Sequence, residues 1–90
     1  MNVVWSPRAR DDLRDIRKYL QQHSPRAARR IMARIIGRVA DQRDMPYAAP
    51  FERGGPERCL VVSKTPYLVL YSVSGDTLTV NAVFHSMRNC

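Results

Sequence analysis

Three residues in the second half of the chain carry side chains that ribonuclease chemistry requires. His85 can act as the base that takes a proton from a ribose 2′-hydroxyl, and Arg58 and Arg88 can neutralise the charge that develops on the phosphate. The reaction also needs an acid for the leaving oxygen, and the sequence identifies none. Tyr67 and Tyr71 carry hydroxyls, but both lie in an apolar run that is typical of core positions. The alternative interpretation, which we favour, is that His85 only hydrogen-bonds a neighbour at the end of a strand.

The sequence offers little for metal or nucleotide chemistry. Cys59 and Cys90 lack a CxxC spacing, His23 and His85 are far apart, and the motifs GxxxxGK[ST], GxGxxG and HExxH are absent. We therefore expect no metal and no cofactor. The longest apolar run, residues 67–71, is far shorter than the roughly 18–20 residues of a membrane span, and the first residues do not resemble a signal peptide. We expect a cytoplasmic protein with no membrane partner, in which a Cys59–Cys90 disulfide is disfavoured.

The elements that must position these residues begin with a strand and two helices. Asn2–Trp5 is a β-branched and aromatic run that predicts a strand. Ser6-Pro7 and Ser24-Pro25 predict helix starts, because serine caps a helix and proline fits its first turn. Apolar stripes extend the two helices to about residues 22 and 43, so they should form an antiparallel hairpin. Gly37, inside the second helix, is expected to mark the close approach of another backbone.

The second half of the chain changes to the two-residue period of strands. A proline- and glycine-rich loop, residues 46–56, precedes three predicted strands at residues 58–63, 67–73 and 77–84. The middle strand is apolar on both faces and should be central. In the last strand, alternation places one set of side chains on one face (Leu78, Val80, Ala82 and Phe84) and a second set opposite (Thr77, Thr79, Asn81 and His85, with Val83 among them). The prediction is an α+β fold of order β-α-α-β-β-β, with the hairpin packed on a small, mostly antiparallel four-stranded sheet.

The positive charge is concentrated in the predicted helices. The 90 residues contain 15 Lys and Arg against 8 Asp and Glu, a net charge of +7. The helical hairpin holds eleven of these cations against five aspartates, which leaves the rest of the chain with a net charge of only +1. Several arginines have aspartates at helical spacing, and we expect the pairs Arg8–Asp11, Arg8–Asp12, Arg14–Asp11 and Arg38–Asp41. Even with these pairs, several cations of the hairpin lack an acidic neighbour, and an acidic partner could bind them.

Three groups of residues resemble the RelE/ParE superfamily of toxins, and the ParE branch most closely. They are Trp5-Ser6-Pro7-x-Ala9-x-Asp11-Asp12-Leu13, then Ser24-Pro25-x-Ala27-Ala28, and a final series over nearly the rest of the chain (Arg58-x-Leu60-Val61-Val62, Pro66-Tyr67-x-Val69-x-Tyr71-x-Val73 and Val83-Phe84-His85-Ser86-x-Arg88). The resemblance implies that residues 1–90 form a single toxin domain. It also implies a bacterial type II toxin–antitoxin pair, in which a ParD-like antitoxin wraps the toxin with an acidic, initially flexible segment.

The resemblance also suggests where partners bind. The cationic hairpin is the expected antitoxin site, and we assign the contacts to six arginines: Arg10, Arg14, Arg17, Arg30, Arg34 and Arg38. Arg58, His85 and Arg88 are the expected contacts with the cellular target. ParE-type toxins are associated with inhibition of DNA gyrase, whereas RelE-type toxins cleave mRNA in the ribosome. Arg58 could instead pair with Glu57, with Asp76 or with the C-terminal carboxylate.

Three departures from the nuclease pattern favour a toxin that is not an enzyme. The sheet region carries little net charge, whereas RelE-like nucleases crowd theirs with Lys and Arg. Ala82 stands where many members have arginine, and only residues 86–90 follow His85, where nuclease members tend to place a catalytic Tyr or His. We therefore expect a gyrase inhibitor, with a ribosome-dependent mRNA endonuclease as the alternative. A third possibility is a basic nucleic-acid-binding module without a toxin role.

Overall fold

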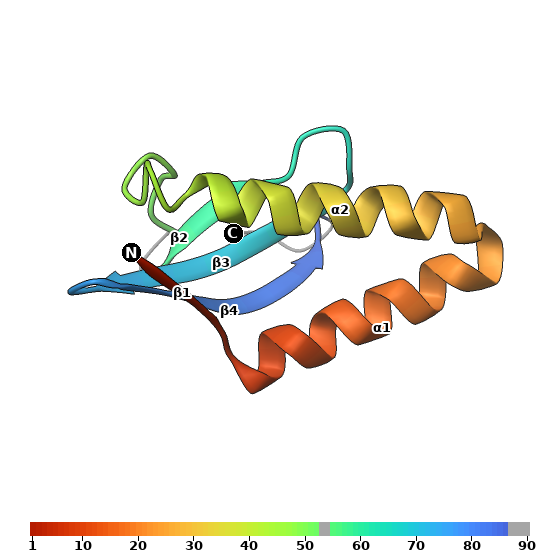
Figure 1. Cartoon of the computed structure of the whole chain (residues 1–90), viewed down its shortest axis with the longest axis horizontal. Coiled ribbons are helices and arrows are strands. Elements are labelled where there is room, and N and C mark those ends of the chain that lie inside the picture. Colours follow the sequence, from red (N-terminus) through yellow and green to blue (C-terminus); the bar gives the residue numbers. More distant parts are fainter. Residues whose placement is uncertain (53–54, 87–90) are drawn as a thin grey trace.

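The computed structural model describes residues 1–52 and 55–86 and has the predicted order of elements. Two helices lie between a first strand and three later strands (Figure 1), with bounds β1 Asn2–Trp5, α1 Pro7–His23, α2 Pro25–Asp41, β2 Arg58–Val61, β3 Tyr67–Ser74 and β4 Thr77–His85. The predicted β-α-α-β-β-β fold of class α+β is therefore confirmed. The helix and strand boundaries differ from those predicted by at most two residues at each end.

The four strands form one sheet in the order β1-β4-β3-β2. β3 pairs antiparallel with both β2 and β4, whereas β1 lies parallel to β4. The apolar strand β3 is therefore an interior strand, as its two apolar faces predicted. β1 and β2 form the edges of the sheet.

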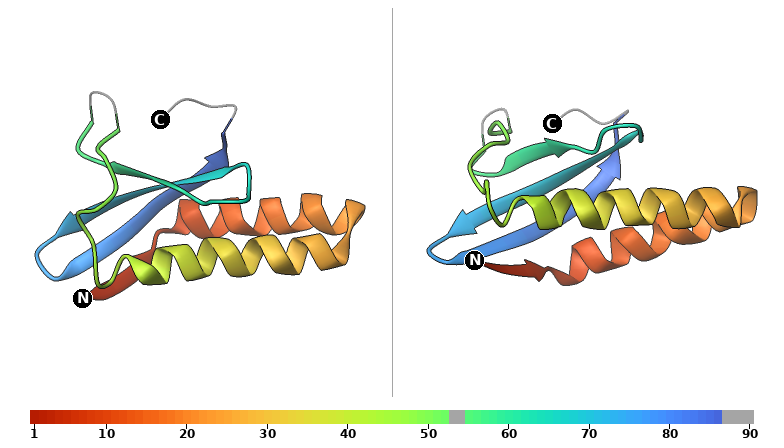
Figure 2. Two further views of the ribbon diagram at one scale, coloured as in Figure 1. Left: turned by 90° about the horizontal axis from the view of Figure 1, so that it is seen from above. Right: turned by 45° about the horizontal axis from the view of Figure 1, so that its top comes forward.

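The two serine-proline pairs start the helices as predicted. The backbone N–H of Ala9 donates to Ser6 Oγ at 3.0 Å, and that of Ala27 donates to Ser24 Oγ at 3.2 Å. Ser24 also ends α1, because its N–H donates to the carbonyl of Leu20. One residue thus ends α1 and starts α2, which produces the tight antiparallel hairpin. Its closed end extends beyond the sheet (Figure 2).

The core lies between this hairpin and one face of the sheet. Ala9 of α1 and Ile35 of α2 are fully buried against sheet residues such as Val69 and Leu78. The ring of Tyr71 lies in the same layer, and its hydroxyl donates to the carbonyl of Pro46 at 2.9 Å. This contact ties the start of the loop after α2 to the middle of the sheet.

A β-bulge in β4 changes which face its last residues occupy. Tyr71 pairs with Val80, but the preceding residue Leu70 pairs with Ala82, so Asn81 is the extra residue. Beyond this point Val83 joins Leu78 and Val80 in the core, and Ala82 and Phe84 move to the opposite face. The expectation that Ala82 and Phe84 share a face with Leu78 is therefore wrong. A period-two reading of the sequence assumes an unbroken strand, and the bulge interrupts it.

The expectation for Gly37 also needs correction. A Cβ atom placed on Gly37 would meet no atom within 4 Å outside its own stretch of helix, so among the described residues no other backbone closely approaches it. Cys59 is buried in β2 as expected. The expectation about a Cys59–Cys90 pair also concerns Cys90, which lies outside the described residues.

Candidate functional site

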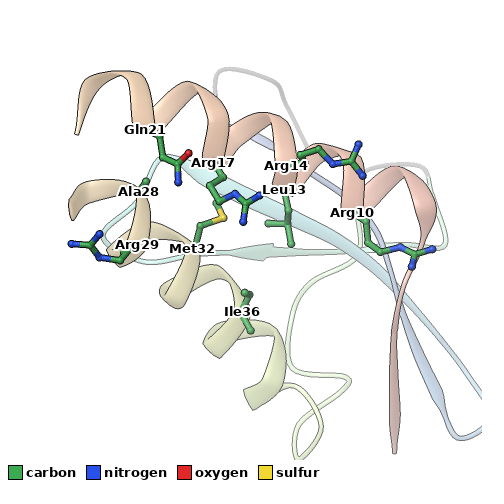
Figure 3. A pocket seen from close by; sticks show the side chains of 9 residues that line it. All are labelled: Arg10, Leu13, Arg14, Arg17, Gln21, Ala28, Arg29, Met32 and Ile36. Atoms are coloured by element: carbon green, nitrogen blue, oxygen red, sulfur yellow. The ribbon is translucent and has the colours of Figure 1, made fainter. Parts of the chain in front are cut away.

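Helix α1 has two grooves, one along each flank. One groove lies between the two helices α1 and α2. It has a volume of about 550 Å³, and we call it the basic groove. Its lining is shown in Figure 3: Arg10, Leu13, Arg14, Arg17, Gln21, Ala28, Arg29, Met32 and Ile36. Four of these nine residues are arginine and none is acidic. The lining is formed because residues three, four and seven apart share one face of a helix.

The basic groove combines apolar side chains with arginines, most of which form no ion pair with the described residues. Leu13 and Met32 are half-buried between the helices, and Ile36 is 51% exposed at one end. In Figure 3 the side chain of Arg17 extends over the space between the helices, beside Met32. Arg14 pairs with Asp11 at 3.2 Å, but no other ion pair involves the groove's arginines in the described part of the chain. Such a surface suits an amphipathic, acidic segment.

The structure divides the six arginines that were assigned to the antitoxin. Arg10, Arg14 and Arg17 line the basic groove, whereas Arg38 lines a smaller hollow beside β2. Arg30 and Arg34 precede Arg38 at four-residue steps, so all three follow the flank of α2 that faces away from α1. Arg29 belongs to the basic groove and was missed. Its position, three residues before Met32 on the apolar stripe, could have identified it.

Two of the four expected ion pairs form. Arg8 Nε lies 3.9 Å from Asp12 Oδ2, in addition to the Arg14–Asp11 pair. Arg8–Asp11 and Arg38–Asp41 do not come within ion-pair distance. The surplus of unpaired arginines on the hairpin is therefore larger than the sequence spacing suggested.

The second groove lies between the other flank of α1 and the ends of β3 and β4, and we call it the acidic groove. It has a volume of about 460 Å³ and is lined by Asp12, Asp15, Ile16, Tyr19, Leu20, Pro66, Tyr67, Val83, Phe84 and His85. Asp12 Oδ2 accepts a hydrogen bond from the backbone N–H of Val83 at 2.9 Å, which fixes α1 against β4 beyond the bulge. The rings of Tyr67 and His85 meet edge to face, with centroids 5.7 Å apart.

The hydroxyl of Tyr67 holds its proton more tightly in this groove than it would in water. Burial raises the pKa of Tyr67, and the nearby Tyr19 raises it further. The groove therefore holds two tyrosine hydroxyls, two carboxylates and an imidazole, a set of proton-carrying groups that the sequence did not reveal. None of its lining residues is Lys or Arg.

The three expected target contacts are not gathered at one place. Arg58 pairs with Tyr71 across the β2–β3 ladder and His85 pairs with Tyr67, so the two lie about 13 Å apart along β3. Arg58 Nη1 donates to the carbonyls of Ala49 at 2.7 Å and Tyr47 at 3.0 Å. Its guanidinium also lies over the ring of Phe51, 4.1 Å from the centroid. Arg58 thus holds its own loop, with no ion pair to Glu57 or Asp76. Arg88 lies outside the described residues.

The described residues, 1–52 and 55–86, contain no group of three potential metal ligands. Neither helix in that part of the chain is long and apolar enough to cross a membrane.

Comparison with known proteins assigns the family. A family described as "ParE toxin of type II toxin-antitoxin system, parDE" matches residues 3–90. The chain is 32% identical to the protein Y4kP of Sinorhizobium fredii, over 93% of this chain and 86% of that one. It is 30% identical to "Toxin RelE2" of Caulobacter vibrioides, over 96% of both. A solved structure titled "Chromosomal ParDE TA system from P. aeruginosa" shares the fold, with a TM-score of 0.83, 19% identity and coverage of 94% and 95%. The chain therefore belongs to the ParE toxin family of type II toxin–antitoxin systems.

Proposed function

We propose that this toxin acts by inhibiting DNA gyrase without cutting nucleic acid, and that an acidic segment of its antitoxin neutralises it by binding in the basic groove. The observation that carries the antitoxin site is the composition of that groove, in which four arginines surround an apolar floor. A helix of the antitoxin could place apolar side chains at i, i+3 and i+4 on this floor. Its carboxylates would then accept hydrogen bonds from the arginines on either side.

The apolar side chains of the groove give a sharper test of this site than its arginines do, because their contribution to antitoxin binding does not depend on charge. We expect Ile36→Ser to weaken binding of the antitoxin encoded in the neighbouring reading frame by about tenfold, measured by calorimetry. The matched control is Val61→Ser on β2, since Val61 is also largely exposed but lies outside the basic groove. Equal effects of both substitutions, or none from Ile36→Ser, would contradict the assignment.

The proposal of a toxin that is not an enzyme is supported by the surroundings of His85. A nuclease base must work beside cations that hold the phosphate, but the lining of the acidic groove contains Asp12 and Asp15 and no Lys or Arg. Two carboxylates repel a phosphate group. Arg58, the described cation expected to help, is held by carbonyls elsewhere.

The test of the target is a supercoiling assay with purified gyrase. We expect the toxin to block supercoiling or to trap cleaved DNA, and to leave RNA on translating ribosomes intact. Added antitoxin should restore gyrase activity. Gyrase that keeps full activity at toxin concentrations that arrest growth would refute this target.

A ribosome-dependent endonuclease is the second candidate. It is favoured by the hydroxyls of Tyr19 and Tyr67 beside His85, and by the relative named Toxin RelE2. It requires that mRNA be cut in the ribosome and that His85→Ala abolish the cut while the protein stays folded.

A further inference from the structure

The acidic groove is unusual on a protein of net charge +7, and α1 is the reason. Along this helix Arg10, Arg14 and Arg17 project to the basic groove, while Asp12 and Asp15 project to the opposite flank. Basic and acidic residues alternate in the sequence at helical spacing, so the helix separates them onto its two sides. One helix thus forms the wall of two grooves of opposite charge.

The two carboxylates of the acidic groove have different roles. One oxygen of Asp12 accepts from the Val83 N–H and also faces Arg8 at 3.9 Å, so this residue is largely occupied within the chain. Asp15, one turn further on, is exposed and forms no ion pair among the described residues. Asp15 is therefore available to a ligand, and Asp12 adds negative potential beneath it.

The walls of the groove are aromatic. Tyr19 is 58% exposed and follows Asp15 by four residues, so the two share the groove-facing flank of α1. His85 of β4 and Tyr67 of β3, whose rings meet edge to face, form the opposite wall. Aromatic faces attract cations, and they attract flat guanidinium groups most readily because these can also stack on a ring.

We infer that the acidic groove is a second binding site, which accepts an arginine side chain of a partner polypeptide. Charge complementarity selects a cation, since the lining has a formal charge of −2 with His85 neutral and lies on an otherwise basic molecule. The flat walls select guanidinium over ammonium. Asp15 receives the guanidinium N–H groups, and Tyr19 covers the guanidinium plane. This inference does not depend on the identity of the cellular target.

The test uses the full chain, labelled with nitrogen-15, and three tripeptides: acetyl-Gly-Arg-Gly-amide and its lysine and citrulline counterparts. We expect the arginine peptide to shift the amide resonances of Asp15, Tyr19 and His85 in a saturable way. Citrulline has the same shape without the charge and should leave these resonances in place. Equal shifts from the citrulline peptide, or equal affinity for the lysine peptide, would overturn the assignment to arginine.

Two matched substitutions locate the contact on the protein. Asp15→Asn should weaken binding of the arginine peptide about fivefold, because it removes the available carboxylate at nearly constant size. Asp11→Asn is the control, since Asp11 is also an exposed aspartate of α1 but pairs with Arg14 outside the acidic groove. If both changes weaken binding equally, the peptide responds only to net charge and the site is refuted. The readout involves neither gyrase nor antitoxin, so it can fail while the proposed function stands.

Discussion

The two grooves along α1 differ in how their charged residues relate to the rest of the chain. Arg10, Arg17 and Arg29 of the basic groove form no ion pair within the described residues, and their side chains are exposed. Asp12 of the acidic groove is instead part of the fold, because it accepts the N–H of Val83. Most charges of the basic groove are therefore not used in ion pairs within the described fold. In the acidic groove, one carboxylate holds the protein together and its neighbour Asp15 faces outward.

This difference means that the grooves should respond differently to the same kind of substitution. Removing charge from the basic groove should change binding and leave stability unchanged. In the acidic groove, a substitution of Asp12 should change the stability of the protein, whereas a substitution of Asp15 should change the binding of a partner. A partner that uses both grooves would clasp α1 from its two sides.

The largest expected effect is on antitoxin binding. The double substitution Arg17→Glu/Arg29→Glu replaces two attractions with two repulsions and should raise the Kd about 100-fold, or about 2.7 kcal/mol. The control is Arg26→Glu/Lys18→Glu, which makes the same change in net charge at exposed residues outside both grooves. Calorimetry at low salt measures both. If the control matches the groove variant, then overall charge and not the groove determines binding.

The next effect concerns stability and distinguishes the two aspartates. Asp12→Ala leaves the Val83 N–H without its acceptor and should lower the free energy of unfolding by about 2 kcal/mol. Asp15→Ala should change it by less than about 0.5 kcal/mol, because that side chain is exposed. Urea denaturation measures both. Asp12→Asn retains an acceptor oxygen and should recover most of the loss; equal losses for Asp12→Ala and Asp15→Ala would remove the distinction.

The fold could be predicted because its signals are local. Ser6 and Ser24 each cap a helix with their own side chain, and the apolar stripes that follow have a spacing only a helix can bury on one face. The strands were predictable for the same reason, up to the bulge at Asn81. A bulge depends on the pairing of β4 with β3, and a single strand's sequence does not contain that information.

The candidate site could be predicted only in part. The sequence placed the surplus charge on the hairpin, but it treated the hairpin as one face. The separation of Arg17 from Arg34, and of both from Asp15, depends on how each helix is rotated against the sheet. The acidic groove was missed because Asp15, Tyr19 and His85 are brought together by the packing of α1 on β4.

A smaller effect tests whether Arg58 behaves like Asp12 or like the arginines of the basic groove. Arg58→Met removes two hydrogen bonds to the carbonyls of Tyr47 and Ala49 and the contact with Phe51, so it should cost about 1.5 kcal/mol of stability. Arg17→Met should cost almost nothing. Thermal unfolding compares the two, and hydrogen exchange at residues 47–49 reports the loop. Unchanged stability of Arg58→Met, with gyrase inhibition lost, would assign Arg58 to target binding instead.

The smallest effect is the pH dependence that Tyr67 gives to the acidic groove. Because burial raises its pKa in the folded state, the unfolded chain loses this proton first as pH rises above about 10. The contribution of Tyr67 to the free energy of unfolding is therefore fully present below about pH 10 and is lost as the pH rises through the folded-state pKa. Tyr67→Phe should show a smaller loss of stability between pH 9 and 11 in urea denaturation.

The arginine tripeptide should act on the same hydroxyl group. A guanidinium bound in the acidic groove stabilises the tyrosinate and should therefore lower the pKa of Tyr67. That decrease, followed by ultraviolet absorbance relative to Tyr67→Phe, should need about fivefold more peptide in Asp15→Asn and no more peptide in Arg17→Glu, since only the first substitution alters the acidic groove.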